Sequence, residues 1–181
     1  MKKLISICFA FHVIAFISVQ AQFIAPTEKS NNAAFNLGFG FGLDYGGFGL
    51  KGILTPAPHL GLFLGLGYNF VGLGYNLGAQ YRIAPDKNVN PFLTAMYGYN
   101  GVIYVSGAPQ YNGTFYGPSI GGGLEFKSKK KPKNFYSFEL LVPFRSQQFT
   151  DSYNALKNNS SITFKNSPLP VAFSFGVHFG L

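Results

Sequence analysis

Residues 35–45 read FNLGFGFGLDY, and this stretch indicates the fold. Phenylalanine, leucine and tyrosine occupy every second position, with only asparagine, glycine and aspartate between them. Successive side chains of a β-strand point to opposite faces of the sheet. The pattern therefore predicts a strand with one apolar face and one small or polar face.

The same alternation recurs along the rest of the chain. We expect eight strands, at residues 35–45, 47–54, 60–70, 72–83, 92–105, 114–127, 135–146 and 169–181. The apolar face of the first strand includes Tyr45, and that of the fifth includes Tyr99 and Ile103. Gly46 and Gly47 are expected to form the tight turn after the first strand, because glycine tolerates the positive φ of short hairpins.

The composition agrees with an all-β domain. The 181 residues are 47% apolar and 18% aromatic but only 11% charged, with 23 glycines. Such a chain has too many aromatic residues for a disordered protein, and it lacks the Ala, Leu, Glu and Lys mixture of helical proteins.

The first residues are typical of a secretory signal peptide. Residues 1–21 carry two lysines, then an apolar run, and then a cleavage site with small residues that ends at Ala21. We expect cleavage after Ala21. Residues 22–34 would form a short N-terminal segment, which the resemblance described below implies to be periplasmic, and residues 35–181 would form the β-domain. The single cysteine, Cys8, lies in the leader, so neither a disulfide nor a cysteine-ligated metal is expected in the mature protein.

The small face of the strands carries too few charges for a surface in contact with water. Its isolated charged residues are Asp44, Arg82, Glu125, Glu139 and Arg145. An eight-stranded barrel is only just wide enough for its interior side chains, which suits glycine and serine, whereas an uninterrupted apolar face suits lipid. We therefore expect a closed, antiparallel, up-and-down transmembrane β-barrel of eight strands.

The C-terminal residues 174–181, SFGVHFGL, resemble the signal that the outer-membrane assembly machinery reads on barrel proteins, through Ser174, Gly176, Phe179 and Leu181. Together with the strand pattern over residues 35–181, the chain resembles the small eight-stranded outer-membrane barrels of the OmpA/OmpX type, in the form found in Bacteroidetes-like bacteria. The resemblance implies location in the bacterial outer membrane after export, with contacts to outer-membrane lipid, lipopolysaccharide and the assembly machinery.

Two groups of residues are candidates for function. The five interior charges are expected to form a structural network, with Arg82 pairing with Glu125 and Arg145 with Glu139. If the resemblance holds, residues 147–167 form an extracellular loop. The candidate contact residues in this loop are Phe149, Tyr153 and Phe164, because loops on rigid scaffolds often carry function.

The sequence predicts no enzyme, cofactor or metal site, since it has neither an H-E-x-x-H motif nor a cluster of aspartate, serine and histidine in an expected outer loop. We expect a structural or interaction role, in envelope integrity or as an accessory subunit that contacts another outer-membrane protein. Three alternatives stay open: a narrow passive channel, a lipid-modifying enzyme using His178, and a soluble secreted lipid-binding barrel. The lysine-rich run 127–133 is read as a solvated turn, and no nucleic acid is expected as a partner.

Overall fold

A computed structural model of the protein describes residues 33–159, 162 and 167–181. The expected signal peptide, nearly all of the 22–34 segment and the candidate contact residue Phe164 lie outside the described residues. The strands are β1 (Ala34–Gly42), β2 (Gly47–Ala57), β3 (Leu60–Tyr68), β4 (Leu73–Arg82), β5 (Val89–Ile103), β6 (Gly113–Lys127), β7 (Phe135–Pro143) and β8 (Ala172–Gly180).

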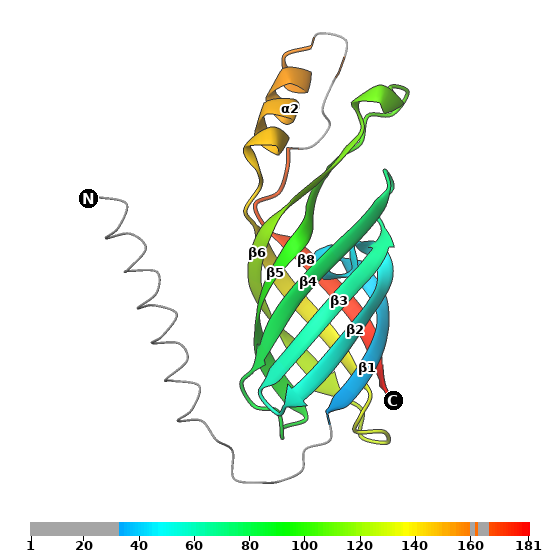
Figure 1. Cartoon of the computed structure of the whole chain (residues 1–181), viewed down its shortest axis with the longest axis vertical. Helices are drawn as coiled ribbons and strands as arrows, with labels where there is room; N and C mark the ends of the chain where they lie inside the picture. The colour runs from blue at the N-terminus through cyan, green and yellow to red at the C-terminus, as the bar shows by residue number, and fades with distance from the viewer. Residues whose placement is uncertain (1–32, 160–161, 163–166) are drawn as a thin grey trace, which may run out of the picture. The chain divides into compact units, whose positions relative to one another are not determined.

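These strands form one closed barrel, in which each strand pairs antiparallel with its neighbours in sequence and β8 pairs with β1 (Figure 1). The all-β, eight-stranded, up-and-down fold predicted from the alternation is confirmed. Large apolar side chains stand exposed on the outer face of every strand. Examples from β1 to β8 in order are Phe39, Leu50, Leu64, Leu77, Leu93, Ile120, Leu140 and Phe173.

The end of the predicted first strand is different. β1 stops at Gly42, and η1, the 3-10 helix Leu43–Tyr45, turns into the barrel, so that Tyr45 is fully buried instead of facing outward. Gly42 and Gly46 make the turn possible, because their φ values of 130° and 70° lie where side chains are rarely tolerated. On β3, a Cβ at Gly65 would overlap the carbonyl of Asp44. The glycines of this region therefore make room for a folded-in turn.

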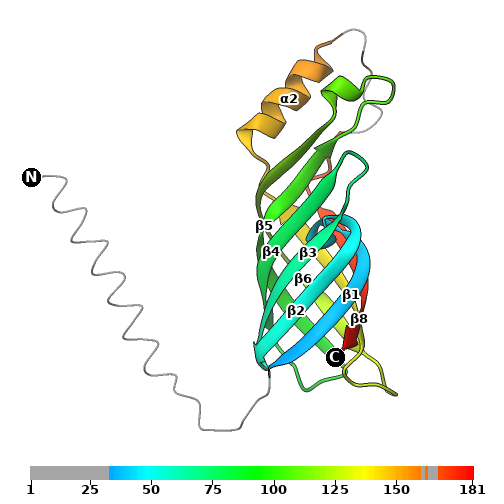
Figure 2. The same ribbon diagram turned by 45° about the vertical axis from the view of Figure 1, so that its right-hand side comes forward.

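The predicted faces of the fifth strand are also partly wrong. The pairing of β5 with β6 shifts by one residue between Tyr99 and Gly101, which is a β-bulge. One extra residue exchanges the two faces beyond it, so Ile103 is buried although the simple alternation places it outside. Tyr99, at the start of the bulge, is also buried instead of facing outward. β5 and β6 have 15 residues each, and their hairpin rises above the rest of the barrel (Figure 2).

The predicted loop 147–167 contains a helix. β7 ends at Pro143, and α2 (Gln147–Lys157) begins after Ser146, whose Oγ accepts a hydrogen bond of 3.3 Å from the Phe149 backbone N–H. A second short helix, η2 (Pro109–Tyr111), lies in the β5–β6 hairpin. Within the described part of the chain, no helix combines the length and apolarity needed to cross a membrane.

Candidate functional site

The middle of the barrel holds a buried cluster of three charges. Lys51 on β2 donates from Nζ to Asp44 Oδ2 at 2.7 Å, and Glu139 Oε2 on β7 lies 3.9 Å from the same nitrogen. All three side chains are almost fully buried, and the Lys51 ammonium also lies 4.1 Å from the centre of the Phe63 ring. The inward turn η1 is therefore held to the barrel wall by an ion pair in a desolvated place.

A second contact holds the same turn to β7 and β8. The Tyr45 hydroxyl lies 2.7 Å from His178 Nε2, and Ser137 Oγ lies 3.0 Å from that nitrogen. The Phe135 ring stacks on the imidazole at 4.4 Å between ring centres. A Cβ on Gly176 would overlap the Tyr45 hydroxyl. Ser137 and His178 are both buried away from solvent. We therefore interpret the contacts among Tyr45, His178 and Ser137 as a structural hydrogen-bond chain.

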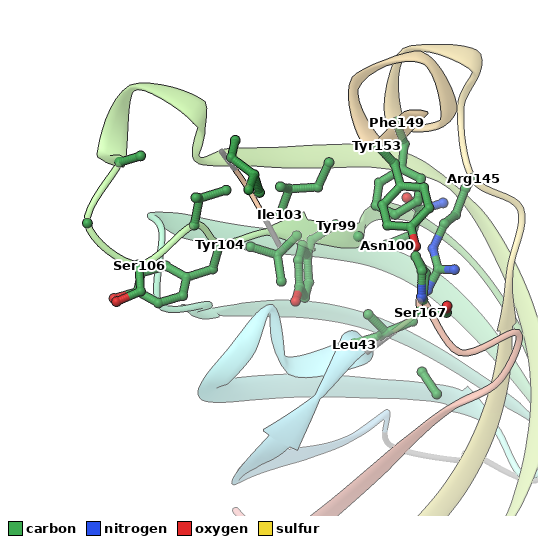
Figure 3. Close-up of a pocket in the computed structure, with 18 residues that line it drawn as sticks. Leu43, Tyr99, Asn100, Ile103, Tyr104, Ser106, Arg145, Phe149, Tyr153 and Ser167 are labelled. Carbon is green, nitrogen blue, oxygen red and sulfur yellow. The ribbon is translucent and has the colours of Figure 1, made fainter. Parts of the chain in front are cut away.

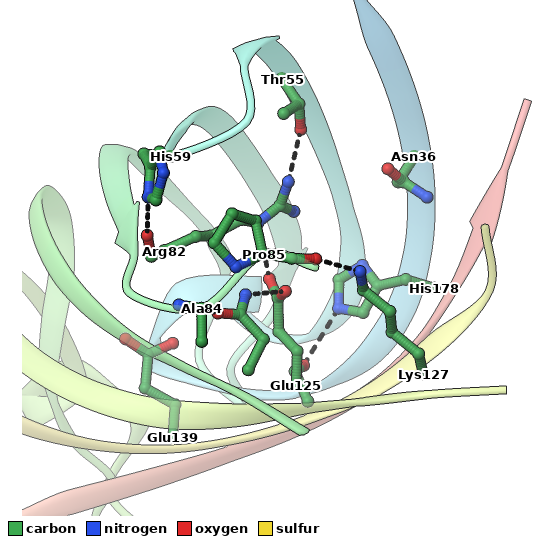
Figure 4. A network of polar contacts seen from close by, with 12 residues as sticks. Asn36, Thr55, His59, Arg82, Ala84, Pro85, Glu125, Lys127, Glu139 and His178 are labelled. Carbon is green, nitrogen blue, oxygen red and sulfur yellow. Dashed lines mark hydrogen bonds and ion pairs between the residues drawn. The ribbon is translucent and has the colours of Figure 1, made fainter. Parts of the chain in front are cut away.

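The end of the barrel that bears the β2–β3, β4–β5 and β6–β7 turns has its own polar network (Figure 4). Arg82 Nε donates to Glu125 Oε1 at 3.0 Å, which is the pair expected from the sequence. Arg82 Nη1 also donates to Thr55 Oγ1 at 2.8 Å, and Asn90 Nδ2 donates to Glu125 Oε2 at 2.8 Å. Both charges are buried, so this network occupies the interior near that end of the barrel.

The fifth expected interior charge lies elsewhere. Arg145 follows the end of β7, where strand geometry no longer directs its side chain inward, and it forms no ion pair with Glu139. Its guanidinium lies instead 4.8 Å from the centre of the Phe149 ring, at the end of the barrel that bears α2. The expected pairing of Arg145 with Glu139 is therefore wrong, and Lys51 is the cation beside Glu139.

The residues of the C-terminal signal divide between the two faces of β8. Ser174 and Gly176 face the interior, whereas Phe179 and Leu181 are exposed, with Phe179 at 48% and Leu181 at 73% of their surface. This division follows the alternation expected from the sequence.

The candidate contact residues of the predicted loop are not all available for contact. Phe149 is buried and packs edge-to-face on Phe115, with ring centres 5.2 Å apart, so its proposed role as a surface contact is wrong. Tyr153 is partly exposed and stacks on Phe149. The two aromatic residues of α2 therefore serve mainly to hold the helix over the β5–β6 hairpin.

A cavity of about 820 Å³ opens between that hairpin and α2 (Figure 3). Apolar side chains such as Leu43, Ile103 and Phe149 line it, and Arg145 is the one charged residue among the described residues of its wall. Burial lowers the pKa of the Arg145 guanidinium from its ordinary value, and the nearby Tyr99 hydroxyl acts in the opposite direction. Sequence reasoning missed this cavity, since it depends on the bulge and on the helix.

No hydrolytic or metal chemistry is visible in the described residues. Residues 117–121 read GPSIG and match the letters of the G-x-S-x-G hydrolase motif, but Ser119 is buried in the middle of β6 and no helix follows. The described residues contain no group of three or more histidine, aspartate, glutamate or cysteine side chains that could hold a metal ion. No protein-family model matches the chain, and the search of curated proteins finds no match.

Proposed function

We propose that the protein is an outer-membrane β-barrel of the small OmpA/OmpX type, with a closed lumen and a structural or interaction role at the cell surface. One observation carries the proposal: a closed barrel exposes large apolar side chains on all eight strands while it buries lysine, arginine, aspartate and glutamate inside. In a lipid bilayer, an apolar outer face and a charged interior are both favourable. An apolar surface of this extent is rare on proteins in water.

The aromatic residues support a membrane position. Tyr68, Tyr75 and Tyr104 lie exposed near the end that bears α2, and Tyr81 and Tyr136 lie exposed towards the other end. Tyrosine is enriched at both membrane–water interfaces, where one end of its ring is apolar and the other is polar. The apolar band between these two levels is where the lipid tails would lie.

The filled interior supports a closed barrel over a channel. Tyr45, Lys51, Phe92 and His178 are among the largest side chains inside, and each is less than 2% exposed. We expect a lumen occupied by side chains from an inward turn and from several strands to leave no continuous water path. In planar bilayers the purified protein should therefore give no conductance above that of the detergent blank, and stable single-channel steps would favour the channel instead.

The location itself is tested by fractionation and by gel mobility. We expect the protein in the outer-membrane fraction, with unboiled samples migrating differently from boiled ones because the closed barrel resists detergent. A protein found in the soluble fraction with no mobility difference would refute the membrane proposal. It would then favour the secreted lipid-binding barrel.

The envelope role is tested by removing the protein from its bacterium. Loss of a structural barrel should raise the sensitivity of the cells to a bulky antibiotic or to detergent, and the wild-type chain should restore resistance. The matched control is Leu64→Arg, which places a charge in the apolar band and should fail to restore it because the barrel assembles poorly. Unchanged sensitivity in the deletion strain would contradict an envelope role and leave an accessory role.

A further inference from the structure

The cavity between the β5–β6 hairpin and α2 has the size and wall of a small-molecule site. Its volume of about 820 Å³ lies within the range of about 300–1,000 Å³ found for ligand pockets. The β-bulge turns Ile103 inward, and α2 adds Phe149, so apolar side chains lie on both sides of the cavity, beside polar ones such as Asn100 and Tyr153. The cavity lies at the end of the barrel that bears α2. A ligand could therefore enter it without passing through the lumen.

The described wall also contains one charged group. The Arg145 guanidinium has no ion-pair or hydrogen-bond partner among the described residues, and its Nε is buried without an acceptor. Asn100 braces the segment beside it, since Asn100 Nδ2 donates at 2.9 Å to the carbonyl of Phe144, the preceding residue. Figure 3 shows Arg145, Asn100 and Tyr153 gathered at one side of the cavity.

The buried charges on the strands are neutralised, whereas Arg145, which is only partly buried, has no anion beside it. Lys51 has Asp44 beside it and Arg82 has Glu125, whereas the described wall of the cavity contains no carboxylate. Water reaches part of the guanidinium, but its buried Nε lacks an acceptor, and a bound anion would supply one. Guanidinium is also the side chain that best matches the planar fork of a carboxylate.

We propose that this cavity binds a single-chain amphiphile with one carboxylate, of the fatty-acid class, whose head group pairs with Arg145 and whose tail lies along Leu43, Val102 and Ile103. A single carboxylate matches the single cation of the wall. A doubly charged phosphate monoester would bring excess negative charge into an apolar surrounding, which is unfavourable. The proposal assigns a ligand class to the cavity and goes beyond the structural role proposed above.

The test uses the full chain in nanodiscs of zwitterionic lipid, titrated with laurate carrying ¹³C at its carboxyl carbon. We expect a saturable change in the carboxyl chemical shift that empty nanodiscs do not give. Methyl laurate has the same tail without the charge, and butyrate has the charge without the tail. Both should bind at least about tenfold more weakly than laurate, because a charge-assisted hydrogen bond and apolar burial each contribute that much.

Two matched variants locate the site. Arg145→Met keeps the length of the side chain and removes its charge, and it should weaken laurate binding at least about tenfold. Lys157→Met makes the same change of charge on the exposed face of α2, outside the cavity, and should leave binding unchanged. The difference in mobility between boiled and unboiled samples shows that each variant still forms its barrel.

Several results would overturn the proposal. These are laurate shifts equal to those with empty nanodiscs, equal binding of laurate and methyl laurate, or an Arg145→Met variant that binds as the wild type does. Tighter binding of dodecyl phosphate than of laurate would assign the site to phosphate head groups instead. If Arg145→Met fails to fold, the comparison of laurate with methyl laurate on the wild-type protein still tests the proposal.

The cavity proposal can be tested separately from the membrane proposal. A chain that stays in solution refutes the membrane proposal, and the same titration in buffer then tests the cavity independently.

Discussion

Removal of the Lys51 charge should strongly destabilise the barrel. At an effective dielectric constant of about 20, unit charges 2.7 Å apart, as for Lys51 and Asp44, attract by about 6 kcal/mol, and charges 3.9 Å apart, as for Glu139, by about 4 kcal/mol. Much of this attraction only offsets the free energy that is lost when the three charged groups are removed from water on folding. Breaking a buried pair by removing one partner costs about 3–5 kcal/mol, since the other charge stays buried. We expect Lys51→Met to lower the free energy of unfolding by that amount.

The measurement is urea-induced unfolding in lipid vesicles, with the folded and unfolded fractions read from unboiled gels. The double variant Asp44→Asn with Lys51→Met should recover more than half of the loss, because no unpaired charge is left in that pair. Lys129→Met changes the net charge equally in an exposed turn and should change stability by less than about 0.5 kcal/mol. A loss below about 1 kcal/mol for Lys51→Met, or no recovery in the double variant, would refute the role given to this ion pair.

Three further predictions concern the plug, the helix and the apolar band. Gly176→Ala should lower the free energy of unfolding by about 1–3 kcal/mol, since its Cβ overlaps the Tyr45 hydroxyl, and urea titration would show the shift in midpoint. Phe149→Ala should make α2 more sensitive to proteinase K while the barrel fragment stays protected, because Phe149 anchors the helix and lies outside the strands; unchanged cleavage would contradict this. Leu64→Arg should cost about 2–4 kcal/mol in vesicles, whereas Asn154→Arg on exposed α2 should cost almost nothing; equal effects in urea titrations would argue against lipid around the strands.

The fold was predictable because strand alternation is a local signal. Phe39 and Leu64 face outward as the period of two requires, and even the weak second strand begins at Gly47 as expected. The inward turn was not predictable from the same signal. Tyr45 continues the alternation in sequence, and its burial depends on glycines such as Gly65 that meet it only in the closed barrel.

The candidate sites were predictable only in part. Arg82 and Glu125 lie on the small faces of separate strands, and the barrel brings them to 3.0 Å. The position of Arg145 depended on where β7 ends, and strand boundaries are poorly defined by alternation. A signal for α2 was present in the sequence, because Phe149, Tyr153 and Leu156 recur at helical spacing behind the capping residue Ser146.

The bond between Tyr45 and His178 joins the two ends of the barrel in chain order. Tyr45 follows the first strand and His178 lies in the last one, and β1 and β8 meet at the seam that closes the sheet. Until the last strand arrives, the tyrosine and serine hydroxyls lack their common imidazole partner, just as the edges of β1 and β7 lack their backbone partners. Closure thus completes the interior and the wall in a single step. A chain that lacks its final strand would lack both the imidazole partner and the closing backbone pairs, so we expect assembly of this barrel to be strongly cooperative.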